Sequence, residues 1–216
     1  MDIVFYYGSG SPFAWKVWLA LEYKNIPYEL RVLSFDKGDT RTPAFKALNP
    51  RGQVPAIKDG HFALWESAAI VEYLEEKKPD PTLLPGDAMK RARARRIATE
   101  ADHTFYPVLR RLTKETLHKR TVDGTQGDPK IIASAQEEIA SELQRFESYL
   151  LGDYFASELS VADFAFYPMV ATLGRLHTRF PQHSVSHKIG PKIEAWAKRI
   201  EGLPFFEKTV PPHWKA

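Results

Sequence analysis

NPRGQVPAIKDGHFALWESAAIVEYL, residues 49–74, carries the densest set of structural signals in the chain. Pro55 stands at the start of a short apolar run, and Asp59-Gly60 separates this run from a second one. An Asp-Gly pair between two short apolar runs is typical of a β-hairpin, because the tight turn needs positive φ. Helical spacing then begins at Ser67. We therefore predict a strand, a turn, a second strand and a helix, in this order.

The conformation of the Val54–Pro55 peptide bond decides what this hairpin can bind. A proline has no N–H to give to a sheet, so Pro55 belongs at the start of a strand or on an edge. A trans bond, the common form, would simply begin an edge strand. A cis bond would turn the chain and leave the backbone N–H and C=O of Val54 facing outward, where an extended peptide-like ligand could pair with them. The sequence leaves both conformations open.

Glu66 and Ser67 stand where the second strand gives way to a helix predicted over residues 67–77. Ser67 is a typical N-cap residue. Position 70 holds Ile70 instead of Glu or Gln, so the first-turn N–H groups lack one expected partner and could receive a ligand carboxylate. Glu66 beside them could hold an ammonium group. A carboxylate and an ammonium on one carbon form the end of an amino acid.

The segments before this stretch complete an α/β unit. Residues 3–7 are β-branched and aromatic, which is typical of a buried strand. Ser11-Pro12 predicts an N-cap with proline at the first helical position. A second strand over residues 28–33 and a short helix near residues 43–48 follow. A parallel βαβ followed by an antiparallel ββα predicts a four-stranded mixed sheet with helices on both faces.

A proline-rich connector separates this unit from an all-helical second half. We predict a first domain over residues 1–78, a linker over residues 79–87 and a helical domain over residues 88–216. One helix begins with a capping-box pattern in which Asp163 replaces the usual Glu or Gln three residues after Ser160. The other helices are predicted near residues 87–119 (with a kink or break at Pro107), 130–150 and 191–199, with a short one after residue 203.

Composition limits the classes of function. The chain has 216 residues and no cysteine, which excludes a thiolate metal site, a catalytic cysteine and a CxxC pair. No apolar run reaches the roughly twenty residues of a membrane span, and the start lacks a signal peptide's basic region, so we expect a cytoplasmic protein without a membrane partner. A net charge of +3 and a basic run at residues 90–96 that points in several directions predict no nucleic-acid partner. His183, His187 and His213 lack metal-ligand spacing and are expected on the surface, so no metal is predicted.

Three short motifs, taken together in their order and spacing, are specific for one protein superfamily. They are Asn49-Pro50-Arg51-Gly52-Gln53-Val54-Pro55, then Glu66-Ser67-Ala68-Ala69-Ile70 with Glu72-Tyr73-Leu74, and finally Ser160-Val161-Ala162-Asp163-Phe164. Through them the chain resembles the cytosolic glutathione transferases over essentially its full length. The resemblance implies an α/β thioredoxin-like domain of order βαβαββα, followed by an all-helical domain. It also implies glutathione as co-substrate and a homodimer.

The resemblance assigns glutathione contacts to the opening stretch. It implies a cis proline at Pro55 and pairing of the cysteinyl backbone of glutathione with Val54. It also implies that Glu66, Ser67 and Gln53 hold the γ-glutamyl end. These assignments agree with the amino-acid-binding chemistry argued from the residues.

The group that activates the thiol lies earlier in the chain. The segment from Ser11 to Val17, SPFAWKV, resembles the first-helix start of the serine-type classes (zeta, theta and delta) and places their active serine on Ser11. A free thiol has a pKa of about 8.5, so a hydroxyl donating to sulfur at the positive end of a helix would stabilise the thiolate. Ser11 would donate a hydrogen bond and would not itself attack. A role limited to capping remains open for Ser11, and Ser9 and Tyr6 are the alternative catalytic groups.

The resemblance also implies an electrophile site lined by the first-helix loop, the long first helix of the second domain and the C-terminus. The candidates are Phe13, His103, Tyr106 and Arg110; the last three are spaced three and four apart and can share one helix face. Polar and aromatic residues at a domain seam are the alternative interpretation. We expect a transferase that directs the glutathione thiolate at a small, hydrophobic electrophile, in conjugation, isomerisation, ether cleavage or dehalogenation. The alternative is a non-catalytic binding or regulatory protein of the same fold.

Overall fold

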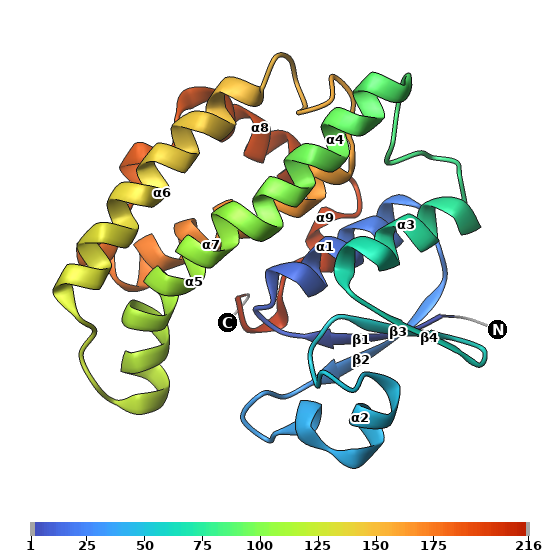
Figure 1. Cartoon of the computed structure of the whole chain (residues 1–216), viewed down its shortest axis with the longest axis horizontal. Coiled ribbons are helices and arrows are strands. Elements are labelled where there is room, and N and C mark those ends of the chain that lie inside the picture. Colours follow the sequence, from blue (N-terminus) through green and yellow to red (C-terminus); the bar gives the residue numbers. More distant parts are fainter. Residues whose placement is uncertain (1–2, 215–216) are drawn as a thin grey trace. The chain divides into compact units, whose positions relative to one another are not determined.

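The computed structural model describes residues 3–214, with the side chains of residues 120–122 excepted. The chain divides into two compact units (Figure 1). The first, here called the N-terminal unit, combines Met1–Leu84 with Leu203–Ala216, and the second, the helical unit, is Pro85–Gly202. The C-terminal segment therefore groups differently from the predicted domain of residues 88–216. Predicted domain ends at residues 1 and 216 lie outside the described residues.

The N-terminal unit is built on one mixed sheet. Its strands are β1 (Ile3–Gly8), β2 (Tyr28–Leu33), β3 (Ala56–Asp59) and β4 (Phe62–Trp65), in the spatial order β2-β1-β3-β4. β1 runs parallel to β2 and antiparallel to β3, and β3 runs antiparallel to β4. The predicted mixed sheet is confirmed.

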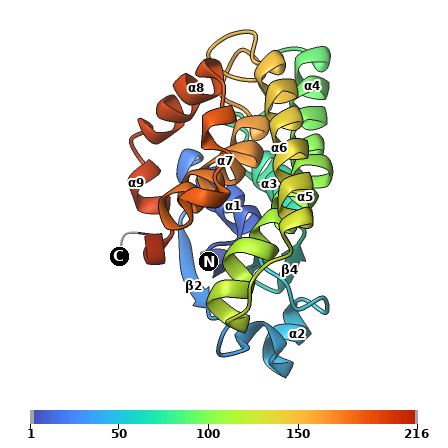
Figure 2. The same cartoon turned by 90° about the vertical axis from the view of Figure 1, so that its left-hand side faces the viewer.

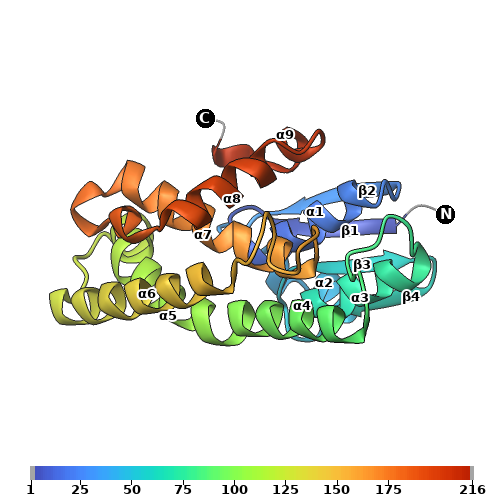
Figure 3. The same ribbon diagram turned by 90° about the horizontal axis from the view of Figure 1, so that it is seen from above.

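Helices cover both faces of this sheet, as predicted. α1 (Pro12–Tyr23) and α3 (Ser67–Lys77) lie side by side on one face, and α2 (Pro43–Leu48) lies on the other (Figure 1). α9 (Phe206–Thr209) joins this unit beside α1 (Figure 3). The reason is a buried contact: the indole Nε1 of Trp15 donates to Oγ1 of Thr209 at 3.0 Å, across 194 residues of sequence.

The β4–α3 junction corrects one prediction. Ser67 was expected to be the N-cap of α3, but it is already the first helical residue, and Glu66 occupies the N-cap position without a side-chain cap. Glu66 adopts a φ of +70°, so the chain turns sharply out of β4 one residue earlier than the side-chain types suggest. The hairpin itself is as predicted, with Gly60 at a φ of +59° in its turn.

The helical unit packs around one buried helix, α7 (Val161–Arg179). α4 (Ala88–Glu100), α5 (Tyr106–Thr113), α6 (Pro129–Tyr149) and α8 (Pro191–Glu201) surround it (Figure 2). The predicted break near Pro107 is a π-helical turn, Ala101–Phe105, immediately before α5. Proline has no N–H for the α-helical hydrogen-bond ladder, and a π-helical turn accommodates the missing hydrogen bond without ending the helix. Among the described residues, no helix is long and apolar enough to cross a membrane.

The capping box of α7 is confirmed and extends into the core. Asp163 accepts from the backbone N–H of Ser160 at 2.8 Å and from the indole of Trp196 at 2.7 Å. It also accepts from the backbone N–H of Phe155 at 3.2 Å. The side chain is fully buried, and this burial raises the pKa of the Asp163 carboxyl to about 6. One carboxylate therefore ties the start of α7 to α8 and to the loop before α7.

Candidate active site

The loop of residues 49–55 is organised by a buried asparagine. The side chain of Asn49 donates to the carbonyl of Gln53 at 2.7 Å and accepts from the backbone N–H of Arg51 at 3.0 Å. Its own carbonyl accepts from Gly52 at 2.9 Å, and Gly52 has a φ of +61°. This arrangement fixes the course of the chain up to Val54 and leaves the Gln53 side chain exposed.

Val54 stands beside the end of β1. The Val54–Pro55 bond is cis, the conformation that the resemblance implies. The ladder of β3 begins only at Ala56, opposite Tyr6, so Val54 lies outside it. Gly8 leaves room for the Val54 side chain, since a β-carbon on Gly8 would lie 2.7 Å from Cγ2 of Val54. Val54 and the end of β1, from which the β1–α1 loop starts, are therefore neighbours within the N-terminal unit.

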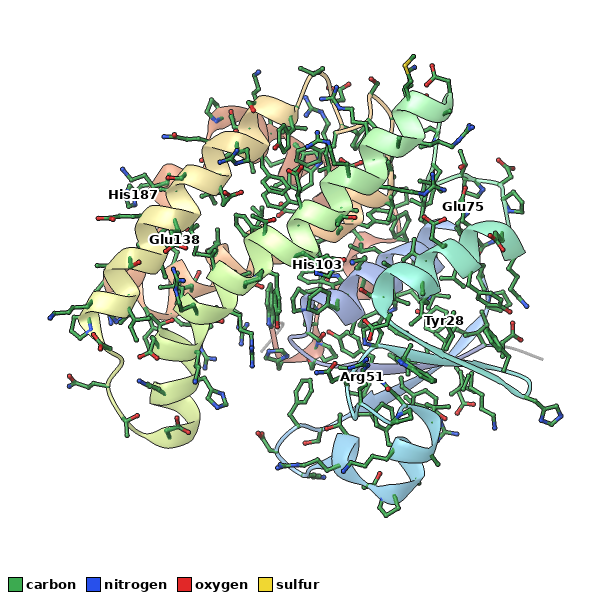
Figure 4. All side chains as sticks on the ribbon, viewed as in Figure 1. Tyr28, Arg51, Glu75, His103, Glu138 and His187 are labelled. Carbon is green, nitrogen blue, oxygen red and sulfur yellow. The ribbon has the colours of Figure 1, made fainter. Side chains whose placement is uncertain are left out.

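The start of α3 carries two of the predicted site residues in different environments. Ser67 is 7% exposed, and its Oγ accepts a hydrogen bond from Nζ of Lys16 at 3.0 Å. Glu66 is exposed, and its carboxylate lies 3.7 Å from Nε of Arg51 (labelled in Figure 4). An exposed ion pair of this kind contributes about 0–1 kcal/mol, so Glu66 is readily available to a ligand.

Ser11 caps α1, as predicted. Its Oγ accepts from the backbone N–H of Ala14 at 3.2 Å, and Pro12 fills the first helical position. A backbone N–H can only donate, so the bond to Ala14 uses a lone pair of Ser11 and leaves its hydroxyl hydrogen available. Capping and thiol activation are therefore compatible roles for the same hydroxyl.

The two alternative catalytic groups lie in different places. Ser9 belongs to the β1–α1 loop, and its hydroxyl forms a hydrogen bond with Nδ1 of His213. Tyr6 is part of β1, and its ring packs against Phe45 of α2, with 5.8 Å between the ring centroids. Ser9 is thus the nearer alternative to Ser11, whereas Tyr6 contacts the helix on the other face of the sheet.

The remaining candidates are divided between the units. Phe13 is in α1 of the N-terminal unit, where Nζ of Lys16 lies 5.4 Å from the centroid of its ring. His103 (labelled in Figure 4), Tyr106 and Arg110 belong to the helical unit. Burial raises the pKa of the Tyr106 hydroxyl, and the charge of Arg110 opposes this rise. His103 is exposed.

Three site neighbours escape prediction from the sequence. Lys16 carries a weak signal, because it interrupts a run of apolar residues in α1 and a buried lysine needs polar partners. Arg51 lies in the first motif of the resemblance, which implies no role for it. His213 was expected to be an unremarkable surface residue, and nothing in the sequence connects it with Ser9, 204 residues earlier. Within the described residues, no group of three or more His, Asp or Glu side chains is placed to hold a metal ion.

Comparisons with known proteins identify the family of the chain. Residues 10–77 match the family model of the glutathione S-transferase N-terminal domain, and residues 129–199 match that of the C-terminal domain. Maleylacetoacetate isomerase of Mus musculus is 34% identical over 186 residues, which are 82% of this chain and 81% of that protein. Glutathione S-transferase A of Pleuronectes platessa is 28% identical over 220 residues, which are 99% of this chain and 93% of that protein.

The likeness extends to solved structures. The crystal structure of a glutathione S-transferase from the Antarctic clam Laternula elliptica has a TM-score of 0.79 and is 32% identical, with 100% of this chain and 94% of that chain covered. Sequence matches over most of the chain and a shared two-unit fold lead to the same assignment. The chain belongs to the glutathione S-transferase superfamily.

Proposed function

We propose that the N-terminal unit binds glutathione along Val54, Glu66 and Ser67 and presents its thiol to Ser11. The observation that carries this proposal is the way α1 joins the two ends of the site. Gly8, the last residue of β1 before that helix, lies against Val54, and Lys16 of α1 donates to Ser67. A single small peptide can therefore reach both the start of α1 and the start of α3.

The γ-glutamyl end fits the start of α3. The first-turn N–H groups of a helix favour an anion, so the ligand carboxylate is placed there, beside the Ser67 hydroxyl. The ammonium group is placed on the exposed carboxylate of Glu66, where it would compete with Arg51. Gln53 supplies an exposed amide next to Val54, whose backbone would pair with the cysteinyl residue as an added strand.

Thiol activation is placed on Ser11. Its hydroxyl hydrogen can point at sulfur while Oγ still accepts from Ala14, and the N-terminus of α1 adds a positive potential. Lowering a thiol pKa by two units requires about 2.7 kcal/mol of thiolate stabilisation. A charge-assisted hydrogen bond together with a helix N-terminus is of that size.

The reaction that follows is proposed to be addition of the thiolate to a small electrophile. The 34% identity to a maleylacetoacetate isomerase favours one variant, glutathione-dependent isomerisation of a carbonyl-conjugated double bond. The thiolate would add to one alkene carbon while the π electrons move to the carbonyl. Rotation about the resulting single bond and expulsion of the thiolate would then give the isomer and free glutathione. Phe13, His103, Tyr106 and Arg110 stay proposed substrate contacts, with Arg110 as the cation for an anionic substrate.

The test separates binding from chemistry. The protein should be retained on immobilised glutathione, and the ultraviolet absorbance of the bound thiolate should give a thiol pKa well below 8.5. Failure to bind glutathione would refute the proposal. Binding without a lowered thiol pKa would instead support the non-catalytic alternative. A panel containing an aryl halide, an aryl ether and a cis-unsaturated diacid would then distinguish conjugation, ether cleavage and isomerisation.

The assembly and setting are inferred from family membership. We infer a homodimer that works in the cytoplasm, without nucleic-acid or metal partners. Sedimentation equilibrium would measure the mass of the assembly directly, and a monomer at micromolar concentration would contradict the dimer.

A further inference from the structure

The C-terminal turn of the chain, residues 212–214, lies against the loop that precedes the proposed catalytic serine. His213 forms a hydrogen bond through Nδ1 with the hydroxyl of Ser9. A β-carbon on Gly10, which has a φ of +90°, would lie 3.3 Å from Cε1 of His213, so glycine permits this close approach. The ring of Trp214 packs edge-on against Trp15 of α1, with 5.1 Å between centroids. All these residues belong to the N-terminal unit.

Trp214 fixes the tautomer of His213. Its indole Nε1 donates to Nε2 of His213 at 3.0 Å. An indole N–H is a donor only, so Nε2 must be the unprotonated nitrogen of the ring. The proton of the neutral imidazole is therefore on Nδ1, and the bond to Ser9 runs from Nδ1–H to Oγ.

The direction of the hydrogen bond from His213 to Ser9 leaves the Ser9 hydroxyl able to act as a donor. Because its Oγ accepts from His213, the hydroxyl hydrogen of Ser9 is not used on the imidazole and can be donated elsewhere. Tyr7 is nearby: burial raises the pKa of its hydroxyl to about 12, and the Ser9 hydroxyl and the Gly10 backbone oppose part of that rise. By hydrogen-bond geometry this buried hydroxyl has no partner among the described residues, so it does not hold the Ser9 hydrogen. Ser9 is partly exposed and stands two residues before Ser11.

We propose that His213 is a positioning residue that turns the Ser9 hydroxyl into a second hydrogen-bond donor for the glutathione thiolate, beside Ser11. The inference rests on the proposed function, because it needs glutathione at the start of α1. It assigns the C-terminal turn a part in thiol activation, although this turn lies about two hundred residues away from Ser9 in sequence. Ser9 and Ser11 then act together instead of being alternatives.

The experiment measures the pKa of the bound glutathione thiol in the full-length protein. His213→Phe keeps a ring but removes the donor, and we expect the thiol pKa to rise by about one unit, the size of one hydrogen bond. The kcat at neutral pH should fall up to tenfold, while the KM for glutathione should stay unchanged because the γ-glutamyl contacts are intact. His213→Asn places an amide N–H where Nδ1–H was and should restore the wild-type thiol pKa. A packing role alone would show the opposite order, with Phe closer to wild type than Asn.

Two further variants keep the test decisive. Trp214→Phe retains the ring on Trp15 but removes the indole N–H, so it should shift the thiol pKa in the same direction as His213→Phe. Ser9→Ala should reproduce the effect of His213→Phe, and the double variant should be no worse than either single one. Wild-type thiol pKa values in His213→Phe and Ser9→Ala would overturn the inference. A wild-type protein that does not bind glutathione would overturn the proposed function instead.

Discussion

Replacement of Ser11 by alanine tests the centre of the proposed mechanism, because it removes two separable contributions. The first is the helix cap: Oγ accepts from Ala14 N–H at 3.2 Å, and loss of such a cap costs about 1 kcal/mol of folding free energy. The second is the donor to the thiolate, a charge-assisted hydrogen bond that we expect to be worth about 1.5–3 kcal/mol, or about one to two units of thiol pKa. Turnover at neutral pH should therefore fall by up to about a hundredfold, as on loss of one oxyanion-type donor.

The chain contains a matched control for the cap. Thr42 caps α2 in the same way, with its hydroxyl accepting from Phe45 N–H at 3.3 Å and a proline at the first helical position. Thr42→Ala should lower the free energy of unfolding at least as much as Ser11→Ala, because it also removes the bond that Oγ1 donates to the Asp39 carbonyl at 2.8 Å; urea titration would measure this. It should leave the thiol pKa unchanged, because α2 is not part of the proposed site.

A second variant separates the two roles at the same position. Aspartate is also a good N-cap, so Ser11→Asp should keep the stability of α1. An ionised carboxylate accepts hydrogen bonds but cannot donate one, and its charge would oppose a thiolate. Ser11→Asp should thus be stable and inactive, with a raised thiol pKa. A normal thiol pKa in both Ser11 variants would refute this reasoning and move the role to Ser9 or Tyr6.

Three further predictions concern Ser67, Lys16 and Asp163. Ser67→Ala should weaken glutathione binding ten- to a hundredfold in calorimetry, which is the size of one charge-assisted hydrogen bond. The dipeptide Cys-Gly lacks the γ-glutamyl group, so it should bind the wild-type protein and the variant equally well. Lys16→Met keeps the length of the buried stem but removes the donor to Ser67, so glutathione affinity should fall by about threefold to tenfold, and unchanged affinity would exclude this contact from the site. The pKa of the Asp163 carboxyl is raised to about 6 in the folded protein. Its contribution to the free energy of unfolding is therefore fully present below the unfolded pKa of about 3.9 and is lost as the pH rises through about 6. The loss amounts to about 3 kcal/mol. The pH dependence of unfolding by urea should lose this component in Asp163→Asn, and identical slopes would contradict the assignment.

Local signals in the sequence predicted most of the N-terminal fold. The Asp59-Gly60 pair, the Ser11-Pro12 cap and the alternation of strand and helical spacing each act within a few residues, where propensity and turn chemistry dominate. The one local error was the assignment of Ser67 as the N-cap of α3, because N-cap residues are predicted from side-chain type alone. The backbone instead places Glu66 at a φ of +70°, and tertiary contacts of the site override the local preference.

The contacts between distant residues could not be predicted in the same way. Lys16 reaches Ser67 across 51 residues, and His213 reaches Ser9 across 204. Neither pair leaves a periodic pattern, because each contact depends on how α1 packs against α3 or on where residues 212–214 pack. The grouping of residues 203–216 with the N-terminal unit follows from the same kind of contact, here between Trp15 and Thr209.

The three serines of the proposed site have a common property in their hydrogen bonds. Each hydroxyl oxygen accepts from a group that can only donate in that position: the backbone N–H of Ala14 for Ser11, the Nδ1–H of His213 for Ser9, and the ammonium of Lys16 for Ser67.

With a lone pair occupied in this way, each hydroxyl keeps its hydrogen available as a donor. Donors are what the proposed binding mode requires at these positions, for the thiolate near Ser9 and Ser11 and for the carboxylate near Ser67. If the partner of a hydroxyl were an acceptor, the hydroxyl would donate its hydrogen to that partner. It would then present only a lone pair to an anion, which an anion repels. The identity of the partner behind each serine therefore determines whether that serine can bind an anion, and two of these partners, Lys16 and His213, are side chains that the fold brings from elsewhere in the chain.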